Sequence, residues 1–146
     1  PLRAQMDATG GPVVDFTAAQ RKDAFEPEPL AQALDLAFGA TVWAQVRLST
    51  AGPVVEMTKL VREGYYKLEI IQLVLMSAEA DIPIKNTLKK RKKGAKLSAI
   101  ARDYGLDYDR VYESALAVQE LVDREYLPRF PEKQRRKGMT SWKDSD

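Results

Sequence analysis

The 146-residue chain contains no histidine and no cysteine. These absences exclude disulfide bonds, cysteine nucleophiles, haem attachment through cysteine, histidine acid–base catalysis and metal centres built from cysteine or histidine. No apolar run approaches the roughly 20 residues that a membrane-spanning helix needs. The catalytic groups that remain are carboxylates, lysines, tyrosines and hydroxyls, and no spacing among them forms a recognisable site. We therefore expect no catalytic residue, no cofactor, no metal ligand and no transmembrane segment.

What is present predicts one globular domain, since 45% of the residues are hydrophobic and 30% are charged. Clusters of proline and glycine divide the chain into an extended arm (1–28), a helical domain (29–127) and a basic tail (128–146). The expected fold is an all-α bundle of five to six short helices. The first residue is proline, which fits either an exported protein whose leader has been removed or a cloned fragment.

Hydrophobic periodicity places the main helices. Residues 66–80 are apolar on most sides, which predicts a central, buried helix. A helix over residues 30–38 should end at Gly39. Residues 41–49 fit a strand or a helix, and we favour the helix because a lone strand would lack a partner. The last long helix should extend from residue 108 to 126, with one apolar seam.

A helix that begins at proline and ends at glycine occurs twice, with a period of 30 residues. The corresponding residues are Pro53 with Gly64, and Pro83 with Gly94. In both copies the glycine is followed by Lys-Leu-x-x-Ile at the start of a second helix. Such a period is typical of stacked helical pairs, so we interpret residues 53–82 and 83–112 as a weak internal repeat.

Residues 97–111 resemble the helix-turn-helix consensus. Ala101 occupies the position where only a small side chain fits between the two helices, and Gly105 occupies the turn. The start of the second helix, which would face DNA, is acidic. It carries Asp107, Tyr108, Asp109, Tyr112 and Glu113, with Arg110 as its cation. Carboxylates at that place would repel phosphates, so DNA binding is our second hypothesis only.

The clearest candidate for a binding surface is a block of seven basic residues without an acidic one between residues 85 and 96. Its members are Lys85, Lys89, Lys90, Arg91, Lys92, Lys93 and Lys96. The block could bind a polyanion or an acidic partner, or it could be a solvated helix face. The tail holds a second candidate, a basic anchor with an isolated tryptophan. It consists of Arg135, Arg136, Lys137 and Trp142.

Residues 60–71 read Leu-Val-Arg-Glu-Gly-Tyr-Tyr-Lys-Leu-Glu-Ile-Ile, and residues 96–106 read Lys-Leu-Ser-Ala-Ile-Ala-Arg-Asp-Tyr-Gly-Leu. Over residues 53–112 the chain resembles a small helical module of bacterial, often exported proteins of undefined function. It departs from that module at Lys96-Leu97, where a tryptophan is usual. The resemblance implies the order of the helices and favours an extracytoplasmic location, and it brings no catalytic residue.

The sequence thus predicts a non-enzymatic interaction or assembly module. Its partners would be proteins, a polyanion or further copies of the chain, bound through the basic block and the two terminal segments. A helix-turn-helix protein that binds nucleic acid is the alternative, and a salt series on duplex DNA distinguishes the two.

Overall fold

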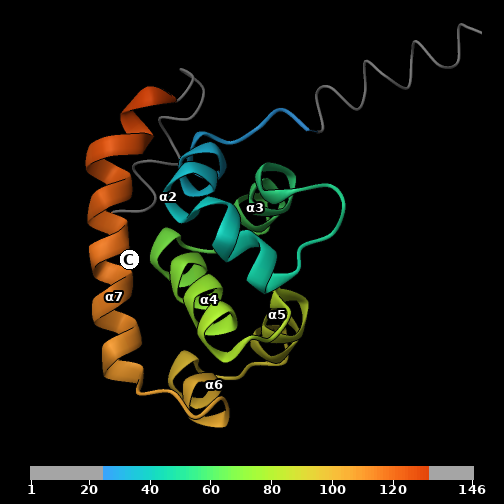
Figure 1. Cartoon of the computed structure of the whole chain (residues 1–146). Helices are drawn as coiled ribbons and strands as arrows, with labels where there is room; N and C mark the ends of the chain where they lie inside the picture. The colour runs from blue at the N-terminus through green and yellow to red at the C-terminus, as the bar shows by residue number, and fades with distance from the viewer. Residues whose placement is uncertain (1–24, 132–146) are drawn as a thin grey trace, which may run out of the picture.

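The computed structural model describes residues 25–131, and the fold is given for these residues. Within this range the protein is all-α and contains no strand, as the sequence predicts. Its α-helices are α2 (Pro29–Val46), α3 (Pro53–Arg62), α4 (Lys67–Ala80), α5 (Ile84–Lys92), α6 (Leu97–Asp103) and α7 (Tyr108–Leu121). Two short turns of helix follow α7, namely η1 (Val122–Tyr126) and η2 (Leu127–Arg129). The helices pack as a small bundle, with α7 along one side (Figure 1).

Helix α4 is the centre of this bundle. It contacts α2, α5, α6 and α7, and Figure 1 shows it between α7 and α5. The side chains of Ile70, Leu73 and Val74 are fully buried. A helix that is apolar on most sides can be stable only where neighbours cover it on most sides. The predicted central helix is therefore confirmed, with Tyr66 as its N-cap residue.

Helix α2 contains a break at Gly39, where the backbone has φ 82° and ψ 167°. The predicted end of the first helical segment at Gly39 is thus confirmed as a kink. The chain resumes a helix and continues to Val46, so the helical interpretation of this segment is confirmed and the strand is wrong. Trp43 is buried after the kink, where its indole N–H donates to the carbonyl of Asp35 (3.1 Å) and its ring forms a T-shaped contact with the ring of Phe38.

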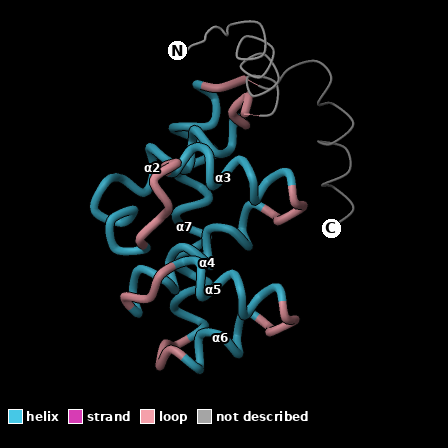
Figure 2. The backbone as a smooth tube through the Cα atoms, turned by 90° about the vertical axis from the view of Figure 1, so that its right-hand side faces the viewer, coloured by secondary structure: helices cyan, strands magenta, loops and turns pink. Residues whose placement is uncertain are grey.

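The two predicted glycine turns have the same backbone geometry. Gly64 ends the α3 segment with φ 101°, and Gly94 ends the α5 segment with φ 99°, a region that other residues rarely adopt. In each turn the residue after the glycine donates its N–H to a carbonyl five residues earlier, at 3.1 and 3.2 Å. The resulting hairpins, α3–α4 and α5–α6, lie one above the other in both views (Figures 1 and 2).

The predicted helix over residues 108–126 is a regular α-helix only as far as Leu121. After α7 the chain forms a π-helical turn and then a 3₁₀ turn that contains Pro128. The guanidinium of Arg129 donates to the carbonyl of Glu125 (3.0 Å) and lies over the ring of Tyr126. Phe130 packs against the core. Packing therefore extends past Pro128, into the first residues of the predicted tail.

Packing also begins before the first helix. Glu28 is buried, its backbone N–H donates to the hydroxyl of Thr58 (3.1 Å), and its carboxylate accepts from Arg62 (3.2 Å). The rest of the predicted arm, residues 1–24, and of the predicted tail, residues 132–146, lies outside the described residues.

Candidate interaction surface

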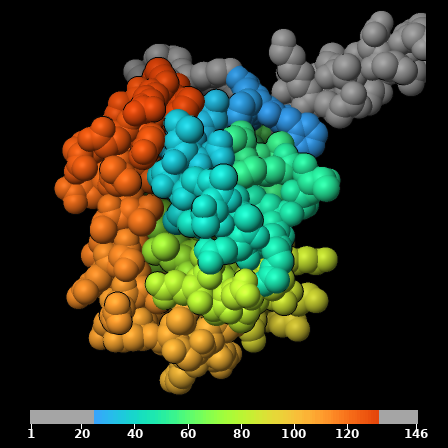
Figure 3. Space-filling model, in the orientation of Figure 1, coloured from blue at the N-terminus to red at the C-terminus, as the bar shows by residue number. Residues whose placement is uncertain are grey.

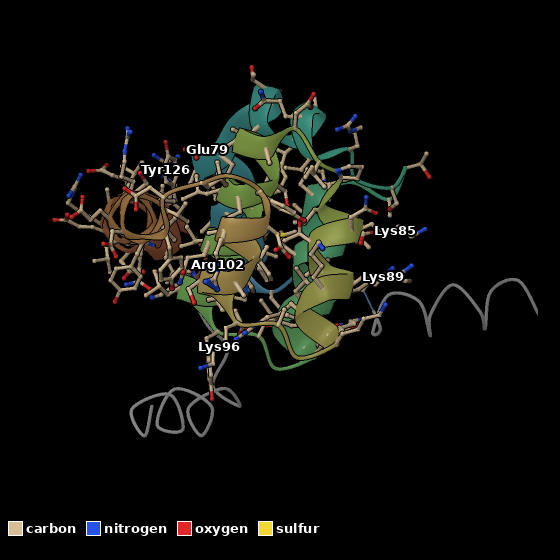
Figure 4. All side chains as sticks on the ribbon, turned by 90° about the horizontal axis from the view of Figure 1, so that it is seen from below. Glu79, Lys85, Lys89, Lys96, Arg102 and Tyr126 are labelled. Carbon is tan, nitrogen blue, oxygen red and sulfur yellow. The ribbon has the colours of Figure 1, made fainter. Side chains whose placement is uncertain are left out.

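Helix α5 positions the first part of the basic block. Ile84 and Thr87 are buried on its inner side, and Leu88 packs against the core. Residues four apart share a helix face, so Lys85 and Lys89 are left on the outer side, where both are exposed. Viewed from below, the two lysines project from the same side of the molecule (Figure 4). This arrangement follows from the helical spacing of three and four residues, which places the apolar and the basic residues of α5 on different faces.

Three cations of the block form ion pairs within the fold. Arg91 is bound most closely, since its Nε donates to the carboxylate of Glu69 (2.7 Å) and its Nη1 donates to the carbonyl of Ala95 (2.9 Å). The other two pairs are longer and lie at the surface. They are Lys90 with Asp103 at 3.7 Å and Lys92 with Glu63 at 4.0 Å. Arg91 therefore has a structural role, and exposed pairs as long as the other two contribute little to stability.

The remaining four lysines of the block are exposed and form no ion pair with any residue between 25 and 131. They are Lys85, Lys89, Lys93 and Lys96. The first three recur every four residues along α5 and its C-cap, and we call them the lysine face. Lys96 caps α6 and projects in a different direction, as does Arg102 (Figure 4). The seven residues predicted as one site thus divide into ion-paired residues, the lysine face and Lys96.

A polar cluster that the sequence analysis missed lies between α4, α5 and α7. The Tyr108 hydroxyl donates to the side-chain carbonyl of Gln72 (2.6 Å), next to the pair of Glu69 with Arg91. Burial raises the pKa of the Tyr108 phenol, and Tyr112 adds to this while Arg91 opposes it. Tyr108 of α7 and Arg91 of α5 thus each bind a side chain of α4, so the cluster joins α7 and α5 to the central helix. Gln72, which interrupts the apolar run from Ile70 to Met76, was the signal for it.

A second buried contact holds the inner side of α5. Ser77 Oγ donates to the carbonyl of Leu73 (2.8 Å) and lies 2.6 Å from Thr87 Oγ1, which in turn is 2.8 Å from the hydroxyl of Tyr104. Ser77 and Thr87 are fully buried. This chain of hydroxyls fixes α5 between α4 and α6, and it therefore fixes the direction in which the lysine face points.

The α6–α7 unit has the small residue and the glycine that the sequence singles out. Ala101 is fully buried and Gly105 has φ 73°. Asp107 caps α7 through a bond from the N–H of Asp109 (3.1 Å). The outer side of the first turns of α7 exposes Asp107, Asp109 and Glu113, together with Arg110. This surface is acidic, so its electrostatics oppose contact with phosphates.

The described residues contain no group of three or more acidic side chains that could hold a metal ion. Between residues 25 and 131 no helix has the length and apolar character to cross a bilayer. The predicted tail anchor, Arg135, Arg136, Lys137 and Trp142, lies outside the described residues.

No protein-family model, no curated protein and no solved structure matches the chain. The resemblance of residues 53–112 to a bacterial helical module therefore stays a prediction.

Proposed function

We propose that the protein is a non-enzymatic interaction module that binds an anionic partner through the lysine face. The observation that carries the proposal is that Lys85, Lys89 and Lys93 are exposed, in line, and without an ion pair in the described part of the chain. A partner that brings negative charge to this face would supply what the fold does not.

Local helix chemistry explains only part of this charge. Cations in the last turn of a helix interact favourably with its dipole, which accounts for Lys89 and Lys93 at the end of α5. Lys85 lies in the first turn, where a positive charge is unfavourable for the same reason. Like charges four residues apart also destabilise a helix, by about 0.2–0.5 kcal/mol for each pair. Neither an ion pair within the described residues nor the helix dipole accounts for Lys85, which supports a role in binding.

The test measures binding of two anionic probes, a polyglutamate peptide and a DNA duplex, over a series of salt concentrations. We expect the variant Lys85→Gln/Lys89→Gln to lose affinity for a probe that uses the lysine face. For duplex DNA, removal of two phosphate contacts should reduce the log–log salt slope by about two units. The matched control is Lys96→Gln/Arg102→Gln, which removes two exposed cations elsewhere. Equal losses in both variants would show unspecific attraction and contradict the proposal.

The helix-turn-helix alternative makes a different prediction. There the start of α7 would enter the major groove, and Arg110 would be its principal cation. The substitution Arg110→Gln would then weaken DNA binding more than Lys85→Gln/Lys89→Gln does. We expect the reverse order, because Asp107, Asp109 and Glu113 surround Arg110 with negative charge.

A further inference from the structure

The outer side of α7 carries an apolar strip. Tyr112 and Leu116 are 40% and 39% exposed, and they lie one helical turn apart. Both lie off the buried seam that Val111 and Ala115 form against the core. The sequence analysis does not name Leu116, although this residue lies outside the predicted apolar seam of the helix. Large apolar side chains that share one exposed face mark a contact surface more often than isolated ones do.

Carboxylates flank this strip. Asp109 and Glu113 are exposed next to Tyr112 on the helix surface, and neither forms an ion pair with a residue of the described range. They are four residues apart, as Lys85 and Lys89 are on α5. Both pairs of charges are therefore separated by about 6 Å along their helices. We call Asp109, Tyr112, Glu113 and Leu116 the α7 face.

The lysine face and the α7 face belong to opposite sides of the molecule. Figure 1 places α7 and α5 at the two sides of α4, and in Figure 4 Lys85 and Lys89 project away from α7. The space-filling view shows α7 forming the surface at one edge, with α5 at the other (Figure 3). One molecule cannot bring its own two faces together, whereas two molecules can.

We propose that the lysine face binds the α7 face of a second copy of this chain, an inference that rests on the proposed function and names its partner. The match is one of charge and shape. The ammonium groups of Lys85 and Lys89 would reach Glu113 and Asp109, while their methylene stems cover the ring of Tyr112. Tyrosine is enriched at the centre of such interfaces. A nucleic acid could not use the α7 face, because its phosphates would meet carboxylates.

Because the two faces differ, the contact is head-to-tail. In a pair, one copy then keeps a free α7 face and the other a free lysine face, so that further copies can add and the assembly forms an open chain or closes into a ring. Three residues of one face would meet four of the other, far fewer than the roughly 20 residues a side of a stable interface, which implies a weak and reversible association. We expect a dissociation constant between about 10 µM and about 1 mM.

Sedimentation velocity tests this with the full chain at low salt over that range of concentration. The sedimentation coefficient of the wild-type protein should rise with its concentration, and added salt should lower it again. Two charge reversals, Lys85→Glu/Lys89→Glu and Asp109→Lys/Glu113→Lys, should each stay monomeric. An equal mixture of the two variants should assemble again, because every α5–α7 contact between unlike molecules is once more between opposite charges. The control Lys96→Glu/Arg102→Glu should assemble like the wild type.

The inference is overturned if the wild type stays monomeric at about 1 mM in low salt, or if the mixture of the two reversed variants does not assemble. Recovery on mixing also shows that both variants are folded. Failure here is distinguishable from failure of the proposed function. A monomeric protein whose binding of polyglutamate still depends on Lys85 and Lys89 keeps the lysine face as a docking surface and loses only the second copy as its partner.

Discussion

Helices α3 and α5 occupy corresponding places in two hairpins with the same turn geometry, yet their charges are balanced differently. On α3, Lys59 lies 3.8 Å from Glu56, and Arg62 pairs with the buried Glu28 at 3.2 Å. On α5 and its C-cap, the lysine face has no such partner within residues 25–131. The comparison shows that a hairpin of this shape does not require unbalanced charge. The helix dipole accounts for Lys89 and Lys93 at the end of α5, and Lys85 is the member of the lysine face for which the described residues offer no such explanation.

The inner sides of the two helices differ as well. Met57 of α3 and Thr87 of α5 are spaced by the 30 residues of the repeat, and both are fully buried. Met57 belongs to the main apolar core, whereas Thr87 is held by the hydroxyls of Ser77 and Tyr104. The first hairpin thus depends on apolar packing at this position and the second on directed hydrogen bonds.

The largest effect is expected from Met57→Ala. Removal of a fully buried side chain leaves a cavity and should lower the free energy of unfolding by about 2–5 kcal/mol. Urea denaturation at neutral pH measures it. A loss below about 1 kcal/mol would contradict the assignment of this position to a tightly packed core.

A smaller effect is expected from Thr87→Val, which keeps the volume and removes the hydroxyl. Ser77 and Tyr104 would each lose a buried partner, which should cost about 1–3 kcal/mol. The double variant Thr87→Val/Tyr104→Phe should lose less than the sum of the two single variants, because both remove the same bond. Strictly additive losses in urea denaturation would show that the two hydroxyls are not coupled.

The turns of the two hairpins differ in an ionisable group, since Tyr65 of the first corresponds to Ala95 of the second. Burial, with help from Glu63 and Glu69, raises the pKa of the Tyr65 phenol above its ordinary value of 10.0. The unfolded chain therefore loses this proton first. The protonated phenol of Tyr65 contributes fully to stability below about pH 10, and this contribution is lost as the pH rises through the raised pKa of the folded state.

Tyr65→Phe should make the decline in the free energy of unfolding between about pH 9 and about pH 11 less steep. Urea denaturation at a series of pH values measures this decline. An unchanged slope would mean that the phenol of Tyr65 ionises equally in the folded and unfolded states.

The smallest effect on stability is expected from Lys85→Gln/Lys89→Gln. These side chains are exposed and have no described ion pair, so the change should stay within about 0.5 kcal/mol of zero. Arg91→Gln, within the same block, should cost about 1 kcal/mol or more because it leaves the carboxylate of Glu69 without its cation. Thermal unfolding of the two variants measures the contrast. A large loss for the lysine variant would make the lysine face structural.

Much of the fold could be predicted from local patterns. The central helix, the break at Gly39 and the turns at Gly64 and Gly94 each depend on residues close in sequence. The π-helical turn at Val122–Tyr126 was not predicted, because the apolar seam of this segment indicates a regular helix to residue 126.

The candidate surface was predictable only as a composition. Seven basic residues identified the block, but their division depends on contacts between residues far apart in the chain. Glu69 lies 22 positions from Arg91 in the sequence, and its carboxylate nevertheless pairs with the Arg91 guanidinium, so Arg91 is not part of the lysine face. Three members of the α7 face, Asp109, Tyr112 and Glu113, were expected on the outer side of this helix, whereas the exposure of Leu116 depends on which side of α7 the core covers.

The most direct test of the central claim, that the lysine face is a docking surface, is a titration of the isotope-labelled protein with a polyglutamate peptide, followed by amide chemical shifts. The account predicts that the shifts at low salt concentrate at Lys85, Lys89 and Lys93 and their neighbours on α5, and that added salt removes them. Shifts spread equally over Lys96, Arg102 and the other exposed cations, or no shifts at all, would contradict it.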